Sequence, residues 1–198
     1  MLFRSVDRLC GEPPARWHPV VGMGRWLGAF GAPWPDASQT QALVRGAAVW
    51  WLGALLCGAV AWVITLALDA LANFAAAGWA QALAVLLMGL LLKPLLAWRM
   101  LRDEVAAVER ALGGGLPAGR AQLARLVSRD TQALTATEVR ESALESLAEN
   151  LNDSLVAPLF WFAIAGLPGA AIYRFANTAD AMWGYRGRWE WAGKWAAR

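Results

Sequence analysis

The chain has 198 residues, of which 58 % are hydrophobic and 17 % are charged. Soluble domains average roughly 45–50 % apolar and about 25 % charged residues, so the composition indicates a membrane protein. Thirteen Trp residues against two Tyr residues suit the water–lipid boundary. The net charge of +3 suits anionic headgroups or an anionic ligand, but no dense basic patch is present, which argues against nucleic acid as a partner. We therefore expect an all-α, polytopic helical membrane protein that forms a single domain in the lipid bilayer.

The first 45 residues are polar and rich in turns. They lack the apolar core and the cleavage site of a signal peptide, so we expect residues 1–45 to form a cytoplasmic leader. A short helix is predicted over residues 22–30. Cys10 lies in this leader and Cys57 in the apolar stretch that follows, so the two cysteines do not form a disulfide framework.

Residues 46–92 contain one charged residue, Asp69, and none of the eighteen Lys and Arg residues. Because a membrane span needs roughly 20 apolar residues, we predict a hairpin of two spans, 46–68 and 70–92, with a tight turn near Asp69. Cationic residues flank the hairpin at both ends. The positive-inside rule then places the N-terminus and everything after Lys93 in the cytoplasm, with Asp69 outside.

Residues 93–154 are expected to form cytoplasmic helices. The apolar pattern predicts an amphipathic helix over 94–112, which ends at the glycines 113–115, and a second short helix over 120–127. Residues 114–120 faintly resemble a phosphate-binding loop. However, Arg120 and Ala121 replace the Lys and Ser/Thr that would hold phosphate and metal, so we do not predict a nucleotide site there.

An acidic helix follows. Thr135 and Glu138 have the spacing of a capping box, which predicts where this helix begins. The helix carries a stripe of four acidic residues. Like charges repel at helical spacing, and only Arg140 is nearby in the sequence to relieve the repulsion among these carboxylates. Such a stripe is either a solvated surface or a metal or substrate site, and Asn150 and Asp153 extend it with oxygen ligands for a hard cation. Four carboxylates lie on one face, at spacings of 3, 4 and 4 residues: Glu138, Glu141, Glu145 and Glu149.

Residues 155–173 are uncharged and contain Pro158 and Pro168. They form either a third span or a proline-broken, re-entrant pair of half-helices that turns at residues 166–169. A plain span would carry the polar tail 174–198 outside the cell, whereas a re-entrant segment returns it to the cytoplasm. Irregular backbone at membrane depth must be covered by protein or water. We favour the re-entrant segment and a cytoplasmic tail.

The polar motifs follow one another in a specific order. They are Gly11-Glu12-Pro13-Pro14, His18-Pro19-Val20, Arg129-Asp130-Thr131, Glu145-Ser146-x-Ala148-Glu149-Asn150-x-x-Asp153 and Asn177-Thr178-x-Asp180-x-Met182-x-Gly184-Tyr185. Together they resemble the CobD/CbiB family of cobalamin biosynthesis from about residue 5 to residue 190. Family members are expected to continue beyond the position of Arg198 with further membrane segments.

The resemblance implies an adenosylcobinamide-phosphate synthase in the bacterial inner (cytoplasmic) membrane, with its motifs facing the cytoplasm. Such an enzyme joins adenosylcobyric acid to (R)-1-amino-2-propanol or its O-phosphate by an amide bond. ATP is the co-substrate and Mg²⁺ the metal, and no cofactor is bound covalently. Other late cobalamin enzymes are candidate partners.

The resemblance also implies roles for individual residues. Phosphoryl transfer depends on Mg²⁺ and cations more than on a covalent nucleophile, so Arg129 and Arg174 are expected to contact phosphate. His18 serves in packing, in capping or in substrate contact, and Tyr185 contacts the corrin or anchors the interface. The candidate catalytic residues are Glu145, Glu149, Asn150, Asp153 and Asp180. Their carboxylates are expected to bind the metal or the amine, and Glu149, Asp153 and Asp180 are the candidate metal ligands. The candidate substrate-binding residues are His18, Arg129, Asp130, Asn177, Thr178 and Tyr185.

Two other functional classes fit parts of the sequence. One is a non-catalytic membrane module that binds corrinoid or serves as a scaffold in the late cobalamin pathway. The other is a transporter, because broken helices with buried polar groups often mark transport sites. A single broken segment without an inverted repeat makes the transporter the weakest of the three hypotheses.

Overall fold

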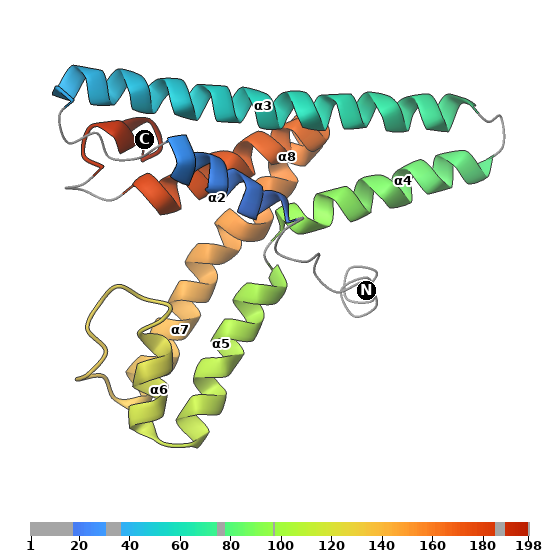
Figure 1. The fold of residues 1–198 in the computed structure, drawn as a ribbon. Helices are drawn as coiled ribbons and strands as arrows, with labels where there is room; N and C mark the ends of the chain where they lie inside the picture. The colour runs from blue at the N-terminus through green and yellow to red at the C-terminus, as the bar shows by residue number, and fades with distance from the viewer. Residues whose placement is uncertain (1–17, 31–36, 75–77, 97, 185–188, 198) are drawn as a thin grey trace. The chain divides into compact units, whose positions relative to one another are not determined.

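A computed structural model of the chain describes residues 18–30, 37–74, 78–96, 98–184 and 189–197. Within these ranges every regular element is a helix (Figure 1). Three stretches are long and apolar enough to cross a membrane, namely Gln39–Asn73, Gly78–Leu95 and Ala136–Trp183. The predicted all-α fold with several membrane-length helices is therefore confirmed.

The chain divides into two compact units, each with its own apolar core. Unit 1 comprises residues 1–96 and 158–198, and unit 2 comprises residues 97–157. The limits of unit 2 lie close to those of the segment 93–154 that the sequence sets apart as cytoplasmic helices. The single membrane domain expected over residues 1–198 stays a prediction.

Unit 2 is a small helical bundle. It contains α5 (Trp98–Gly113), α6 (Leu116–Leu123), α7 (Ala136–Leu151) and the π-helical turn η3 (Asn152–Val156). Helices α6 and α7 both pack on α5 (Figure 1). Their contact buries one apolar stripe of each helix, with Val108, Leu123 and Val139 at most 1 % exposed. The amphipathic helix predicted over 94–112 is confirmed as α5.

Helix α6 begins four residues earlier than the predicted start at residue 120. Its first turn contains Pro117, whose fixed φ and missing N–H suit that position. Gly115 precedes the helix with φ 124°, a backbone conformation that favours glycine. These two residues set the start of α6, which ends at Leu123 rather than at the predicted residue 127.

The capping box at the start of α7 is confirmed. The Thr135 hydroxyl accepts a hydrogen bond from the backbone N–H of Glu138, and the Glu138 carboxylate accepts one from the backbone N–H of Thr135 at 2.7 Å. Two of the N–H groups at this helix end are thereby satisfied. Arg140, in the second turn, donates to Glu109 of α5 at 2.8 Å and so links the two helices.

The Glu109–Arg140 pair predicts a modest dependence of unit 2 stability on pH. The hydrogen bond from Arg140 lowers the pKa of Glu109 below its ordinary value of 4.5. A carboxylate with a lowered pKa stabilises the folded state above its unfolded pKa, and this contribution is lost as the pH falls through the folded pKa. Hydrogen exchange of α5 and α7 amides should therefore show lower stability for Glu109→Gln than for the wild type near pH 7, and the two proteins should converge as the pH falls below the lowered pKa of Glu109. A difference that persists at acid pH would exclude this ion pair as its source.

Unit 1 holds the membrane-length helices α3 (Gln39–Phe74) and α4 (Gly78–Leu92) and the helix α8 (Ala157–Trp183). Shorter elements complete it: α2 (Pro19–Phe30), the 3-10 turn η2 (Lys93–Leu95) and the 3-10 turn η4 (Ala192–Trp195). Helix α2 confirms the short helix predicted over 22–30, and its Trp26 indole N–H donates to the carbonyl of Val49 at 3.1 Å. Leu27, Phe175 and Trp183 form the most deeply buried part of the core.

The tight turn predicted near Asp69 is wrong. Helix α3 continues through Asp69, which is exposed, and ends at Phe74. The neighbours of Asp69 are mainly Leu and Ala, the strongest helix formers, so one exposed Asp does not end the helix. A helix of 36 residues rises about 54 Å, more than the roughly 30 Å of the hydrocarbon core, so part of α3 extends beyond it.

Helix α8 is interrupted where the sequence predicts a break. Ala165 (φ −129°, ψ 16°) and Gly166 (φ 63°, ψ −156°) leave helical geometry, and Pro168 follows within the next turn. The Gly166 conformation is one that essentially only glycine adopts. The broken backbone is thus observed, while the re-entrant path of this segment stays a prediction.

Substitution of Gly166 by Ala should lower the free energy of unfolding by about 1–3 kcal/mol, because a side chain is strained in that region of φ and ψ. Thermal unfolding in detergent measures this loss. Gly89→Ala in α4 is the matched control, since no described atom lies within 4 Å of the position its Cβ would take. The control should be as stable as the wild type or more stable, because Ala is the better helix former. Equal behaviour of the two variants would contradict the strained conformation.

Candidate functional site

A polar cavity of about 320 Å³ lies within unit 2. One wall is the loop 126–129, and the other is one face of α7 that continues into η3. The cavity brings together five of the residues that the sequence singles out: Arg129, Glu145, Glu149, Asn150 and Asp153. The cavity is the candidate functional site.

Helical spacing places the α7 side chains in the cavity. Glu145, Glu149 and Asp153 follow one another at intervals of four residues, so they lie along the same face. Asp153 already belongs to the π-helical turn η3. Single π-helical turns within α-helices occur frequently at functional sites.

Arg129 and Glu145 form an ion pair at the edge of the cavity. Their side chains are 49 % and 67 % exposed, respectively. An exposed ion pair of this kind contributes little to stability, so either partner is available to a charged ligand at small cost. The expectation that only Arg140 relieves the acidic stripe is wrong, because Arg140 pairs with Glu109 and Arg129 pairs with Glu145.

The four carboxylates of the predicted stripe have different roles. Glu138 caps α7 through Thr135. Glu141 is exposed and does not line the cavity. Glu145 pairs with Arg129, and Glu149 lines the cavity from an exposed position. The stripe therefore divides into an N-terminal half with structural or solvated side chains and a C-terminal half that forms the site.

Amide side chains complete the oxygen-rich wall. The Asn150 Nδ2 donates to the backbone carbonyl of Ser146 at 2.8 Å, so the Oδ1 of the same amide is the acceptor left for a ligand. The Asn152 Nδ2 donates to Asp153 Oδ1 at 3.1 Å and orients that carboxylate. A carboxylate and an amide oxygen held in this way are typical ligands of hard cations.

The donor set of the cavity fits Mg²⁺ that arrives with a phosphate ligand. In the part of the chain that the structure describes, no group of three or more His, Cys, Asp and Glu residues is arranged to hold a metal ion. Mg²⁺ does not need such a cage, because it is usually bound by one or two carboxylates together with water and substrate phosphates. Glu149 and Asp153 would supply those carboxylates. Asp180, the third predicted ligand, lies on α8 in unit 1.

The predicted residues of α8 make contacts within their own helix. The Thr178 hydroxyl donates to the carbonyl of Arg174 at 2.7 Å, and Arg174 Nη1 donates to Asn177 Oδ1 at 3.3 Å. Arg174 is only 8 % exposed, so the guanidinium predicted to contact phosphate lies in the core of unit 1. Asp180 is exposed on the same helix.

Two further predicted residues lie elsewhere, and a third cannot be placed. The His18 carbonyl accepts hydrogen bonds from the N–H groups of Val21 and Gly22, which places His18 at the start of α2. The Asp130 carboxylate accepts a hydrogen bond from the N–H of Gln132 at 2.9 Å, as in an Asx turn, and does not line the cavity. Tyr185 lies outside the described residues.

The sequence prediction missed the serines of the site. Ser142 and Ser146 are buried, with 6 % and 7 % exposure, and line the cavity behind the carboxylates, while Ser128 lines it from the opposite loop. Serine in the middle of a helix carries little structural signal by itself. The signal that would have found these serines is helical spacing, because Ser142 lies three residues before Glu145 and Ser146 three residues before Glu149.

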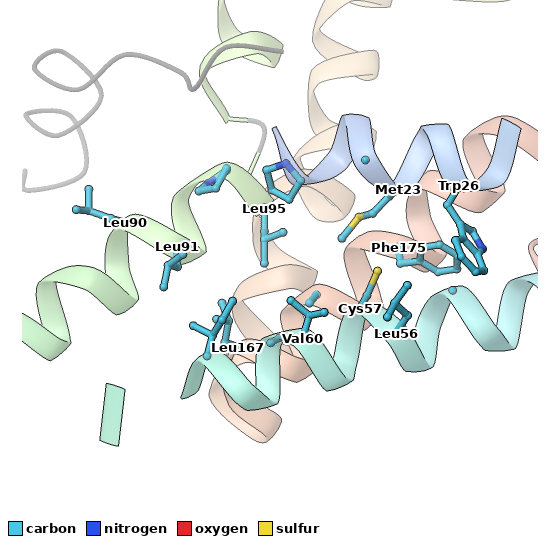
Figure 2. A pocket seen from close by; sticks show the side chains of 17 residues that line it. Met23, Trp26, Leu56, Cys57, Val60, Leu90, Leu91, Leu95, Leu167 and Phe175 are labelled. Atoms are coloured by element: carbon cyan, nitrogen blue, oxygen red, sulfur yellow. The ribbon is translucent and has the colours of Figure 1, made fainter. Parts of the chain in front are cut away.

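A second cavity, of about 580 Å³, lies within unit 1 (Figure 2). Helices α2, α3, α4 and α8 and the turn η2 line it. Its wall is apolar, and it contains none of the predicted site residues. A reaction that transfers phosphate would find no ionic partner there.

Comparison with known proteins finds matches along the whole chain. The family model described as "CobD/Cbib protein" matches residues 3–198. The "Probable cobalamin biosynthesis protein CobD" of Pyrococcus furiosus is 39 % identical over 194 residues, which are 98 % of this chain and 63 % of the relative. The "Cobalamin biosynthesis protein CobD" of Chromobacterium violaceum is 40 % identical over 187 residues, which are 91 % of this chain and 55 % of the relative. The chain thus spans about 60 % of the length of the curated relatives that it matches. No solved structure matches it.

Proposed function

This chain belongs to the CobD/CbiB family, and from that premise we propose that it is an adenosylcobinamide-phosphate synthase. The names of its relatives support a role in cobalamin biosynthesis. The reaction joins a propionate carboxylate of adenosylcobyric acid to the amine of 1-amino-2-propanol or its O-phosphate, with ATP and Mg²⁺.

The polar cavity of unit 2 is the observation that carries the proposal. It combines the Arg129 guanidinium, the carboxylates Glu149 and Asp153 and the Asn150 amide within one space. A guanidinium recognises phosphate by charge-assisted hydrogen bonds. Oxygen ligands on the opposite wall suit the metal that accompanies ATP. This set of groups is the one that activation of a carboxylate by phosphoryl transfer requires.

The proposed chemistry has two steps. In the first, a carboxylate oxygen of the corrin attacks the γ-phosphorus of ATP, an acyl phosphate forms and ADP leaves. In the second, the amine nitrogen attacks the acyl carbon, and inorganic phosphate leaves with the electron pair of the broken C–O bond. Mg²⁺ would neutralise the phosphate charge during the transfer. Arg129 would orient phosphate, and Glu145, which lines the same cavity, would accept the proton that the amine loses.

The same proposal includes a location. The three membrane-length helices indicate a membrane protein. The absence of Lys and Arg from residues 46–92 favours the bacterial inner membrane with both flanks in the cytoplasm. Because ATP is a cytoplasmic substrate, the cavity of unit 2 must open to that side.

The experiment that tests the function uses the full chain in lipid nanodiscs. It is supplied with adenosylcobyric acid, Mg²⁺, ATP and either the free or the phosphorylated amine, and the products are separated by chromatography. We expect one new amide per ADP and per phosphate released. Corrinoid that binds, as seen in its absorption spectrum, but is never amidated would overturn the proposal in favour of a non-catalytic binding module.

A further inference from the structure

The residues that line the apolar cavity of unit 1 (Figure 2) range from buried to exposed. Met23, Leu167 and Phe175 are buried lining residues, at most 7 % exposed. Leu56 and Val60 of α3 and Leu91 of α4 also line it but are 49 %, 52 % and 37 % exposed, and we call the part that they border its mouth. The mouth is thus bordered by two helices that are long and apolar enough to cross a membrane.

The chemistry of the wall selects an apolar occupant. None of the lining residues carries a hydroxyl, amide, carboxyl or cationic side chain. The Trp26 indole N–H already donates to Val49. A polar ligand would lose its hydrogen bonds to water here without replacing them, which is costly. The volume of about 580 Å³ lies within the roughly 300–1,000 Å³ of small-molecule pockets.

Two cationic residues are close to lining residues in the sequence. Arg25 is exposed on α2 between Met23 and Trp26, and Lys93 precedes Pro94 in η2, directly after α4. The sequence places this end of α4 on the cytoplasmic side, where the leaflet is rich in anionic lipid. An occupant with an apolar chain and an anionic headgroup matches both the cavity and its surroundings.

We propose that this cavity binds one acyl chain of an anionic phospholipid, whose phosphate lies near Arg25 and Lys93. The lipid would fill space that the packed helices leave open, since voids within a packed core forfeit dispersion contacts. The site is independent of the polar cavity and of the reaction proposed there.

Native mass spectrometry tests the proposal on the full chain, released from nanodiscs of phosphatidylglycerol and phosphatidylcholine. We expect the wild type to retain one phosphatidylglycerol, and Val60→Trp, which fills the mouth, to retain at least about ten times less. Val63→Trp is the matched control. Val63 lies on the same helix and is 64 % exposed, but it does not line the cavity. Equal retention by the two variants would overturn the site, and equal retention of both lipids would overturn the anionic headgroup. A dimer without bound lipid would show that a second copy of the chain fills the cavity, and this result would also overturn the proposal.

A second measurement does not depend on the folding of a Trp variant. Cys57 lines the cavity, and Cys10 is removed by Cys10→Ser. Addition of phosphatidylglycerol to protein in detergent should slow the alkylation of Cys57 by N-ethylmaleimide at least about fivefold, because an acyl chain in the cavity covers the thiol. An alkylation rate that does not change with lipid would overturn the proposal.

Discussion

Glu149→Gln and Asp153→Asn are each expected to slow amide formation at least about 100-fold, the range for removal of one group that stabilises a charged transition state. Both substitutions keep the size of the side chain and remove its negative charge. The two carboxylates line the polar cavity together with Arg129 and Asn150. Loss of either charge would weaken the binding of Mg²⁺. Because Mg²⁺ would neutralise the phosphate being transferred, the binding of that phosphate would weaken as well. Single-turnover measurement of the amide product gives the rate.

Glu141→Gln is the control for both variants. Glu141 belongs to the same helix and the same acidic stripe, but it is exposed and does not line the cavity. This variant should retain the wild-type rate. If Glu141→Gln formed amide as slowly as Glu149→Gln, the total negative charge of α7 would explain both rates. The carboxylates that line the cavity would then have no specific part in the reaction.

Gly46→Leu is expected to destabilise unit 1 by about 3 kcal/mol or more, at or above the upper end of the usual range for overpacking. A Cβ at position 46 of α3 would collide with the backbone carbonyl of Ala192 in η4. Backbone atoms cannot rotate away as a flexible side chain can, so η4 would have to leave α3. The edge contact between Trp51 and Trp195 would be lost with it.

Thermal unfolding in detergent, followed by the loss of the monodisperse peak in gel filtration, measures this effect. Gly89→Leu serves as the control, because α4 leaves open space around Gly89 among the described atoms. The control should unfold within a few degrees of the wild type. A Gly46→Leu protein as stable as the control would show that η4 is not packed against α3 in solution.

Local signals predicted much of the fold. The capping box, the amphipathic pattern of α5 and the glycine and proline of the break in α8 act within a few residues, and each appears where the sequence places it. The turn predicted near Asp69 is wrong because span length alone divides the apolar stretch there, whereas the helix propensity of the flanking Leu and Ala residues extends α3 to Phe74. A local pattern thus predicts helices better than it predicts where two long apolar helices separate.

The site was predictable only in part. Helical spacing predicted a stripe of four carboxylates that Asp153 extends, and of these residues Glu145, Glu149 and Asp153 line the cavity. The ion pairs were not foreseen, because Arg129 reaches Glu145 across 16 residues and Arg140 reaches Glu109 across 31. Pairs so far apart in the chain depend on how the helices pack, which spacing alone does not reveal. For the same reason the sequence did not show that only half of the acidic stripe faces the cavity.

The Mg²⁺ requirement of the reaction tests most directly whether the polar cavity of unit 2 holds the metal and its phosphate. The rate of amide formation is measured as a function of Mg²⁺ concentration for the wild type, Asp153→Asn and Glu141→Gln. We expect Asp153→Asn to need at least about ten times more Mg²⁺ for half its maximal rate, because loss of a metal ligand weakens metal binding by that much or more. Glu141→Gln should match the wild type. An Asp153→Asn protein with an unchanged Mg²⁺ requirement would contradict a metal site in this cavity.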